Sequence, residues 1–246
     1  MRPNARLASA IELIDLIETE INQSGAPMDR VIQNYFRARR YAGSKDRRAV
    51  GEMVYSVYRM REHLVWILNT LGHQNFSARE LFIVWMLGME LSFDGFDDED
   101  QFAPNTLSDN EEKLVDAFSK LDLSEMPAFT TANIPEYAHA YLYERFGEHE
   151  IREADSLNEK APLTIRVNPQ KFKSEDALNN IKTISEGFEK NKFSPFGYTT
   201  SASINISQNQ LYKSGKIEIQ DEAAQIASSL VQANANHTVV DLCAGA

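Results

Sequence analysis

The sequence predicts a multidomain protein of the α plus α/β class. An all-helical domain is expected over residues 1–158, a small α/β linker domain over 159–216, and the first helix and strand of a third domain over 217–246. Three observations predict this division. Apolar residues recur at helical spacing up to residue 158, strand-like alternation begins near residue 163, and the last thirty residues follow a strand, helix, strand pattern.

The helical domain begins with three predicted helices. Apolar residues spaced three or four apart predict an amphipathic helix over 6–23, which Ser24-Gly25 ends. Pro27 suits the first turn of a second helix. Ser44 can cap a long third helix that ends before Gly72.

Capping boxes mark two further helix starts. Ser77 with Glu80, and Ser108 with Glu111, have the spacing at which the two side chains cap a helix reciprocally. The remaining helices are expected at 81–91, 114–121, 135–147 and 148–158. Residues 92–112 contain eight acids and no base, which is typical of a solvated loop.

The pattern changes after Pro162. Residues 163–167 alternate as a strand, and Asn168-Pro169 predicts a turn. Ser174 can cap a helix, and Ser194 to Gly197 form a predicted turn. Short strands are expected at 203–206 and 217–219. We interpret this region as a small α/β module.

The last residues read as the opening of a cofactor site. Asp221 is placed to cap a helix, and the apolar run at 238–242 predicts a buried strand. Asp241 lies at the carboxyl end of that strand, where open α/β sheets place ligand-binding groups. Ala244 and Gly245 would let a backbone approach a ligand closely. A strand-end Asp can equally cap the following turn.

Composition excludes several classes of protein. The chain has 246 residues, 43% of them hydrophobic and 25% charged, as in ordinary globular domains. One cysteine excludes an internal disulfide, and the five histidines have no cysteine partner at zinc-site spacing, so no metal is expected. The longest apolar block, residues 81–89, is too short for a membrane span, which needs about 20 residues. With no secretory leader, a soluble cytoplasmic protein is expected.

Charge is unevenly distributed along the chain. The formal net charge is −11, which argues against a nucleic-acid partner. Residues 30–61, however, carry nine Lys and Arg against two acids, or +7, which leaves −18 for the remainder. Six of these cations lie close together in the sequence: Arg37, Arg39, Arg40, Lys45, Arg47 and Arg48. This cluster is either an RNA-binding surface or a solvated helix face, and we favour RNA.

Two motifs near the carboxyl end carry a family resemblance. QDEAAQ at 220–225, followed by VVDLCAGA at 239–246, resembles the entry into the catalytic domain of the Sun/Fmu family of S-adenosylmethionine-dependent RNA cytosine-C5 methyltransferases. That family has a cofactor-wrapping loop of the type DLCAAPGGK. Residues 241–244 match it, and Gly245 and Ala246 replace the commoner Ala-Pro. The resemblance implies a truncated Rossmann-like methyltransferase domain that binds S-adenosylmethionine through Asp241, Cys243, Ala244, Gly245 and Ala246.

The helical region resembles a second part of the same family. RRYAGSKDRR at 39–48, flanked by apolar helices, is similar to the NusB-like RNA-binding domain at the amino terminus of many Sun/Fmu enzymes. NIPEYAHAYLYERFGE and SLNEKAPLTIRVNPQK resemble the family's transition out of that domain. The resemblance implies an enzyme of rRNA processing that methylates C5 of cytosine, and we expect a monomer with ribosomal RNA as its partner.

Cys243, the sole thiol, has two interpretations. Attack on cytosine C6 requires a thiolate, but no activating neighbours are visible, and a small buried side chain in the cofactor loop is the favoured interpretation. The resemblance places the catalytic cysteines beyond residue 246, so this chain alone is expected to be inactive. Two alternatives stay open: a NusB-like RNA- or protein-binding module without catalysis, and a different cofactor-binding α/β enzyme.

Overall fold

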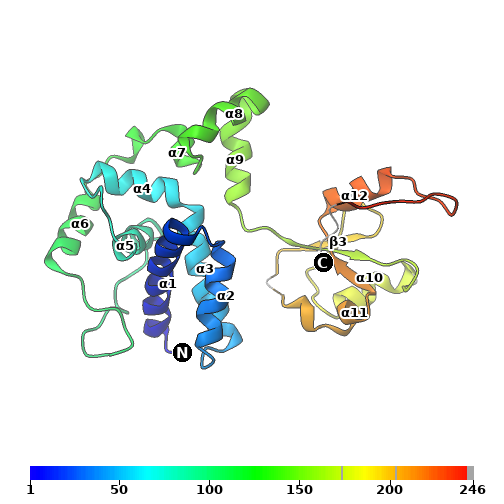
Figure 1. Ribbon diagram of the computed structural model, residues 1–246, viewed down its shortest axis with the longest axis horizontal. Helices are drawn as coiled ribbons and strands as arrows, with labels where there is room; N and C mark the ends of the chain where they lie inside the picture. Colours follow the sequence, from blue (N-terminus) through cyan, green and yellow to red (C-terminus); the bar gives the residue numbers. More distant parts are fainter. Residues whose placement is uncertain (173, 203, 243–246) are drawn as a thin grey trace. The chain divides into compact units, whose positions relative to one another are not determined.

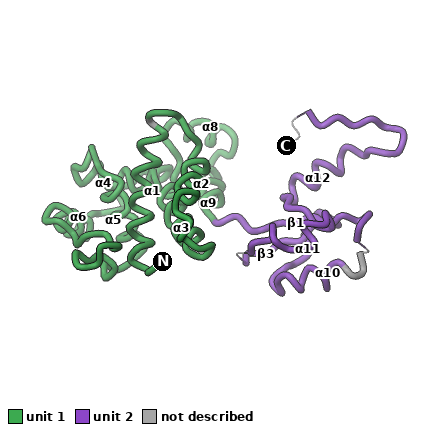
Figure 2. The backbone as a smooth tube through the Cα atoms, turned by 60° about the horizontal axis from the view of Figure 1, so that its bottom comes forward, with its two compact units in different colours: residues 1–159 green, residues 160–246 purple. Residues whose placement is uncertain are grey.

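The computed structural model describes residues 1–172, 174–202 and 204–242. The chain divides into two compact units, Met1–Glu159 and Lys160–Ala246 (Figure 2). The first unit consists of helices, and the second combines a four-stranded antiparallel sheet with short helices. The predicted α plus α/β class is therefore confirmed.

The first unit is a bundle of helices followed by a smaller helical group (Figure 1). Its α-helices are α1 (Pro3–Ser24), α2 (Met28–Ala38), α3 (Ser44–Arg59), α4 (Arg61–Thr70), α5 (Ala78–Gly88), α6 (Asp109–Ser119), α7 (Ala128–Thr131), α8 (Glu136–Phe146) and α9 (Glu150–Asn158). Two 3₁₀ turns, η1 (Leu123–Glu125) and η2 (Gly147–His149), connect some of them.

Helix α5 lies at the centre of this unit. After Arg79 and Glu80 in its first turn it is apolar on all sides, and residues 81–86 are all buried. A helix without a polar face must be surrounded by other elements. Helices α1, α3, α4 and α6 pack against it, and α1 contributes Leu13, Ile14 and Ile17, none of which is exposed. Fully burying one such side chain contributes about 1.5–3 kcal/mol, so this core fixes the positions of α1 and α3.

Most helix ends follow the sequence signals. Both predicted capping boxes form, and α1 ends at Gly25, whose φ of 63° is favourable for glycine. The predicted third helix is divided, because the backbone at Met60 leaves helical geometry and separates α3 from α4. Ser44 is the first residue of α3 instead of its cap. Asp46 caps this helix by accepting a hydrogen bond from the backbone N–H of Gly43.

The second unit is built on a sheet with strand order β2-β3-β1-β4, and every pairing is antiparallel. The strands are β1 (Leu163–Val167), β2 (Glu189–Lys190), β3 (Gly197–Thr200) and β4 (Ile217–Ile219). Ile165 of β1 lies opposite Tyr198 of β3 and Ile219 of β4. Helix α10 (Ser174–Lys182) contributes Ala177 and Ile181 to the small core of this unit.

Two differences from the sequence analysis concern short strands. Strands β2 and β3 were not predicted. Where a strand was expected at 203–206, the described residues contain the 3₁₀ turn η3 (Ile206–Gln208), followed by α11 (Gln210–Lys213). The predicted strand at 217–219 is β4, and it pairs with β1 in the sheet of the linker region.

The carboxyl-terminal segment differs most from expectation. Helix α12 (Glu222–Leu230) forms where predicted. The prediction of a buried strand at 238–242 is wrong. These residues form no strand, and the side chains of Val240 and Leu242 are 70% and 91% exposed. A parallel-type strand becomes buried only between neighbouring strands, and no described strand pairs with this segment.

Candidate nucleic-acid interface

The connection between α2 and α3 carries the predicted cations. Helix α2 ends at Ala38, the chain turns through 39–43, and α3 begins at Ser44. A hydrogen bond from the N–H of Ala42 to the carbonyl of Arg39 (3.0 Å) closes the turn. All six predicted cations therefore lie within one helical hairpin, whose residues 37–48 we call the basic turn.

Asp46 is the acid of the basic turn, and its side chain points into the helical unit. Its carboxylate accepts hydrogen bonds from the terminal amine of Met1 (3.0 Å) and from Nε of Arg6 (2.9 Å). The hydrogen bond from the terminal amine, assisted by Arg6 and the N–H of Gly43, holds the pKa of Asp46 below its usual value against the opposing effect of burial. The positive charges of the Met1 amine and of Arg6 offset the charge of Asp46, so this acid does not neutralise the outward-facing cations.

Arg39 and Arg47 have structural partners. The guanidinium of Arg39 donates to Glu12 of α1 and lies 3.8 Å from the centroid of the Tyr35 ring. Tyr35 also donates to Glu12 (2.7 Å), and burial is the main cause that raises the pKa of Tyr35 to about 12. Nε of Arg47 donates to the carbonyl of Ala42 (2.8 Å). These two arginines stabilise the turn and its contact with α1.

The other four cations are directed outward. Arg37, Arg40, Lys45 and Arg48 are all exposed. Arg37 donates to the side-chain oxygen of Asn34 (3.2 Å), which leaves its charge without an acid. Within the described part of the chain, Arg40 and Lys45 have no ion-pair partner. The structure thus distinguishes Arg39 and Arg47, which hold the turn through hydrogen bonds, from the other four cations. Arg47 is itself exposed, and Arg39 is half-buried.

The position of these cations on α3 is electrostatically unfavourable for the folded protein alone. The amino terminus of a helix carries a partial positive charge, so a cation there costs about 0.3–1 kcal/mol. Lys45, Arg47 and Arg48 all lie in the first two turns of α3. Helix amino termini and arginines both bind phosphate groups. A bound anion would offset this cost, and the arrangement is suited to one.

Two contributors to this surface were not predicted. Arg6 was missed because its partner Asp46 lies 40 residues away, and no local pattern marks such a pair. Tyr41 is 72% exposed in the middle of the basic turn. Its signal was available in the sequence, because an aromatic residue within a basic run is typical of single-stranded nucleic-acid binding.

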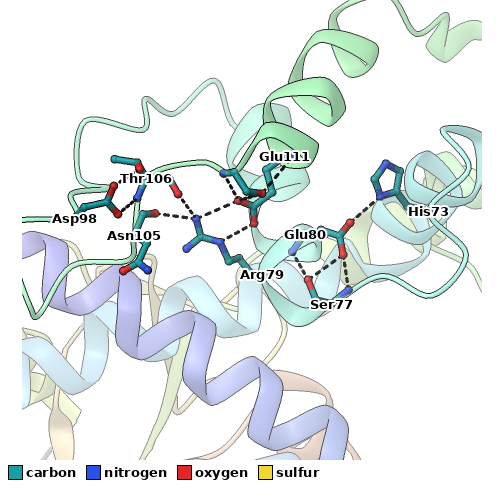
Figure 3. Close-up of polar contacts among 9 residues, drawn as sticks. His73, Ser77, Arg79, Glu80, Asp98, Asn105, Thr106 and Glu111 are labelled. Atoms are coloured by element: carbon teal, nitrogen blue, oxygen red, sulfur yellow. Dashed lines mark hydrogen bonds and ion pairs between the residues drawn. The ribbon is translucent and has the colours of Figure 1, made fainter.

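The acidic loop that follows α5 is held in place by Arg79 (Figure 3). Its guanidinium donates to Glu111 (2.7 Å) and to the backbone carbonyls of Asn105 (2.8 Å) and Thr106 (3.1 Å). Thr106 in turn donates its N–H to Asp98 (3.0 Å). The loop was predicted over 92–112: residues 92–108 are irregular, but 109–112 belong to α6. The contacts of Arg79 give the irregular part a defined conformation.

The two capping-box glutamates have additional partners (Figure 3). Glu80 accepts from the N–H of Ser77 (2.8 Å) and lies 2.7 Å from Nδ1 of His73. Burial acts to raise the pKa of Glu80, but the hydrogen bonds from Ser77 and His73 together lower it. Burial also acts to raise the pKa of Glu111, but the hydrogen bonds from Arg79 and Ser108 together lower this pKa as well. Both carboxylates are therefore ionised at neutral pH.

The QDEAAQ motif attaches α12 to the turn before β3 within the second unit. Glu222 accepts the backbone N–H groups of Phe193 (2.6 Å) and Ser194 (2.8 Å). Gln225 is only 5% exposed. It accepts from the hydroxyl of Ser194 (2.6 Å) and donates to the carbonyl of Gln220 (2.8 Å). Glu222 and Gln225 of the motif therefore hold α12 in place through hydrogen bonds.

The predicted cofactor loop is described only in part. Asp241 lies in the exposed segment that follows α12. Cys243, Ala244, Gly245 and Ala246 lie outside the described residues. The side chains around Asp241 are exposed, and the described residues of this loop do not by themselves form a packed site for S-adenosylmethionine.

The described residues lack two features, a membrane-spanning helix and a metal-binding cluster. No helix among them is long and apolar enough to cross a membrane. No group of three or more His, Cys, Asp or Glu side chains in this part of the chain could hold a metal ion. The contacts of His73 with Glu80 (2.7 Å) and of His139 with Glu150 (3.0 Å) each join only two such side chains.

Comparison with known proteins supports the fold alone. No protein-family model matches this sequence, and no curated protein matches it. The fold is similar to a solved structure described as "Crystal Structure of PH0851", with a TM-score of 0.58 and 16% identity. The match covers 94% of this chain and 56% of that chain. This chain thus corresponds to little more than half the length of that protein.

Proposed function

We propose that the helical unit binds RNA through the exposed cations Arg37, Arg40, Lys45 and Arg48. The inward orientation of Asp46 carries this proposal, since it removes the acid of the basic turn from the outer surface. Arginines pair with phosphates bidentately and can stack on unpaired bases. An exposed surface with cations and a helix amino terminus suits the RNA backbone.

We further propose that this chain is the amino-terminal part of an S-adenosylmethionine-dependent methyltransferase that acts on C5 of cytosine in ribosomal RNA. The QDEAAQ and DLCAGA sequences and their spacing support this proposal. The alternative is a binding module without catalysis. It makes the same prediction for the basic turn, so RNA binding can be tested independently of any enzymatic activity.

A binding experiment on the full chain tests the proposal. The triple variant R37A/R40A/K45A removes exposed cations and spares Arg39 and Arg47, which hold the turn together. Exposed ion pairs contribute about 0.2–1 kcal/mol each, so affinity for a structured ribosomal RNA fragment should fall about tenfold. Fluorescence anisotropy at fixed salt measures this change.

The matched control is K113A/R145A/R152A. It removes the same charge from exposed positions on α6, α8 and α9 of the same unit. We expect this variant to bind RNA almost as tightly as the wild type. Equal losses in the two triple variants would show that net charge alone is responsible, and would contradict a specific surface.

A further inference from the structure

A groove lies beside the basic turn on the helical unit. It has a volume of about 420 Å³, and Tyr41 and Phe102 are among its lining residues. Small side chains of α1, those of Ala5, Ala8 and Ser9, line the same groove. Tyr41 is 72% exposed and Phe102 is 56% exposed, so both rings offer apolar surface to solvent.

Local hydrogen bonds hold both aromatic residues in place. Tyr41 belongs to the connection that is closed between Ala42 and Arg39. The N–H of Phe102 donates to Asp100 (3.0 Å), within the acidic loop that Arg79 fixes. The two rings are therefore displayed on ordered turns, although neither is packed into the core. Exposed rings on ordered backbone lose little entropy when a ligand stacks on them.

The charges around the groove favour an anionic ligand. Arg40 and Lys45 lie on the same turn as Tyr41, and both are exposed. Two acids beside the groove, Glu12 and Asp100, already have partners. Glu12 pairs with Arg39, and Asp100 lies 3.8 Å from Arg2 and accepts the N–H of Phe102.

We propose that this groove receives an unpaired nucleobase of RNA, stacked against Tyr41 and Phe102, while the basic turn binds the adjacent phosphates. This inference rests on the RNA-binding function proposed above. It adds that the helical unit distinguishes RNA with a bulged or looped-out base from a continuous duplex. Unstacked bases commonly stack on aromatic side chains in this way.

Two RNAs and three variants of the full chain test the groove. The RNAs are a hairpin with two unpaired uridines in a bulge and the same hairpin without the bulge. The variants are Y41A, F102A and, as an equally exposed control on α8, Y137A. Tyr137 is 80% exposed, and all three substitutions should leave thermal unfolding nearly unchanged.

We expect the wild type to bind the bulged RNA more tightly. Y41A and F102A should each weaken that binding roughly tenfold, the size expected for one lost base–aromatic stack. Binding to the continuous hairpin should not change, Y137A should match the wild type, and Y41F should retain the preference. With 5-iodouridine in the bulge, photocrosslinking should join the RNA to Tyr41 or Phe102.

Three outcomes would overturn the inference. First, the wild type could bind both hairpins equally, with the RNA affinity of Y41A and F102A unchanged. The groove would then have no part in RNA recognition, and the basic turn would remain the RNA-binding surface. A Y41A variant that alters self-association of the chain without altering RNA affinity would make the groove an interface between copies. Failure of the wild type to bind either RNA would overturn the proposed function together with the groove.

Discussion

At the scale of single residues, Asp46 determines how the basic turn presents its charge. The residue is surrounded by cations in the sequence, yet its carboxylate is engaged by the terminal amine and by Arg6 on α1. Arg39 pairs with Glu12 on the same helix. Met1 and helix α1 therefore offset one acid and one arginine of the turn, and Arg40 and Lys45 have no acid partner among the described residues.

Replacing Asp46 by Asn should lower the melting temperature at pH 7, and the deficit should vanish in acid. The pKa of Asp46 is lowered in the folded state. Its stabilising effect is thus fully present above the unfolded pKa of about 3.9 and is lost as the pH falls through the lower folded value. Thermal unfolding between pH 2.5 and 7 measures this, with exposed Asp155→Asn as the control. A constant deficit across this range would show that charge is not the cause.

At the scale of elements, α12 is attached to the sheet by two residues of QDEAAQ. Glu222 binds the backbone of the turn before β3, and Gln225 is buried between Ser194 and Gln220. The exposed side of α12 includes Ala223, Ala224 and Ala227, which contribute little to the core. The helix therefore depends on polar contacts more than on apolar burial.

Substituting Gln225 by Ala should loosen α12. The hydroxyl of Ser194, which is buried, would lose its acceptor, and such an unsatisfied group costs about 1–3 kcal/mol. Hydrogen exchange of the α12 amides is the suitable measurement, because both tryptophans, Trp66 and Trp85, belong to the first unit. Gln210→Ala, at an exposed position on α11, is the control. Unchanged protection of α12 in Q225A would disprove this role for the motif.

The elements also show which features a sequence can predict. Helix starts at Ser77 and Ser108 were predicted because a capping box is a local signal. Strand β2 was missed because it has only two residues, and β3 because its sequence Gly-Tyr-Thr-Thr shows no alternation of apolar and polar residues. The strand expected at 238–242 did not form, since burial of a strand depends on neighbours that its own sequence does not specify.

The candidate site was predictable to a similar extent. The six cations could be found because they are close in sequence. The pairing of Arg39 with Glu12 and of Asp46 with Arg6 could not, because both partners lie in a distant helix. The same reason applies to Arg79, whose partners lie 26–32 residues further along the chain. Contacts of this kind appear only once the helices are packed.

At the scale of the whole molecule, an acidic protein carries a basic surface. The net charge is −11, but charges farther apart than the Debye length, about 8 Å at physiological salt, are largely screened from one another. A phosphate in contact with Arg40 and Lys45 responds chiefly to nearby cations. Several acids of the loop at 92–108 are in addition engaged by internal contacts, as Asp98 is by Thr106.

The salt dependence of RNA binding tests the central claim most directly. Each phosphate contact contributes about 0.7–0.9 to the slope of log affinity against log salt, so four exposed cations predict a slope near −3 for the full chain. The R37A/R40A/K45A variant should flatten this slope by about 0.7–0.9 for each lost contact, while K113A/R145A/R152A should not. A wild-type slope near zero, or equal slopes in all three proteins, would contradict RNA binding through the basic turn.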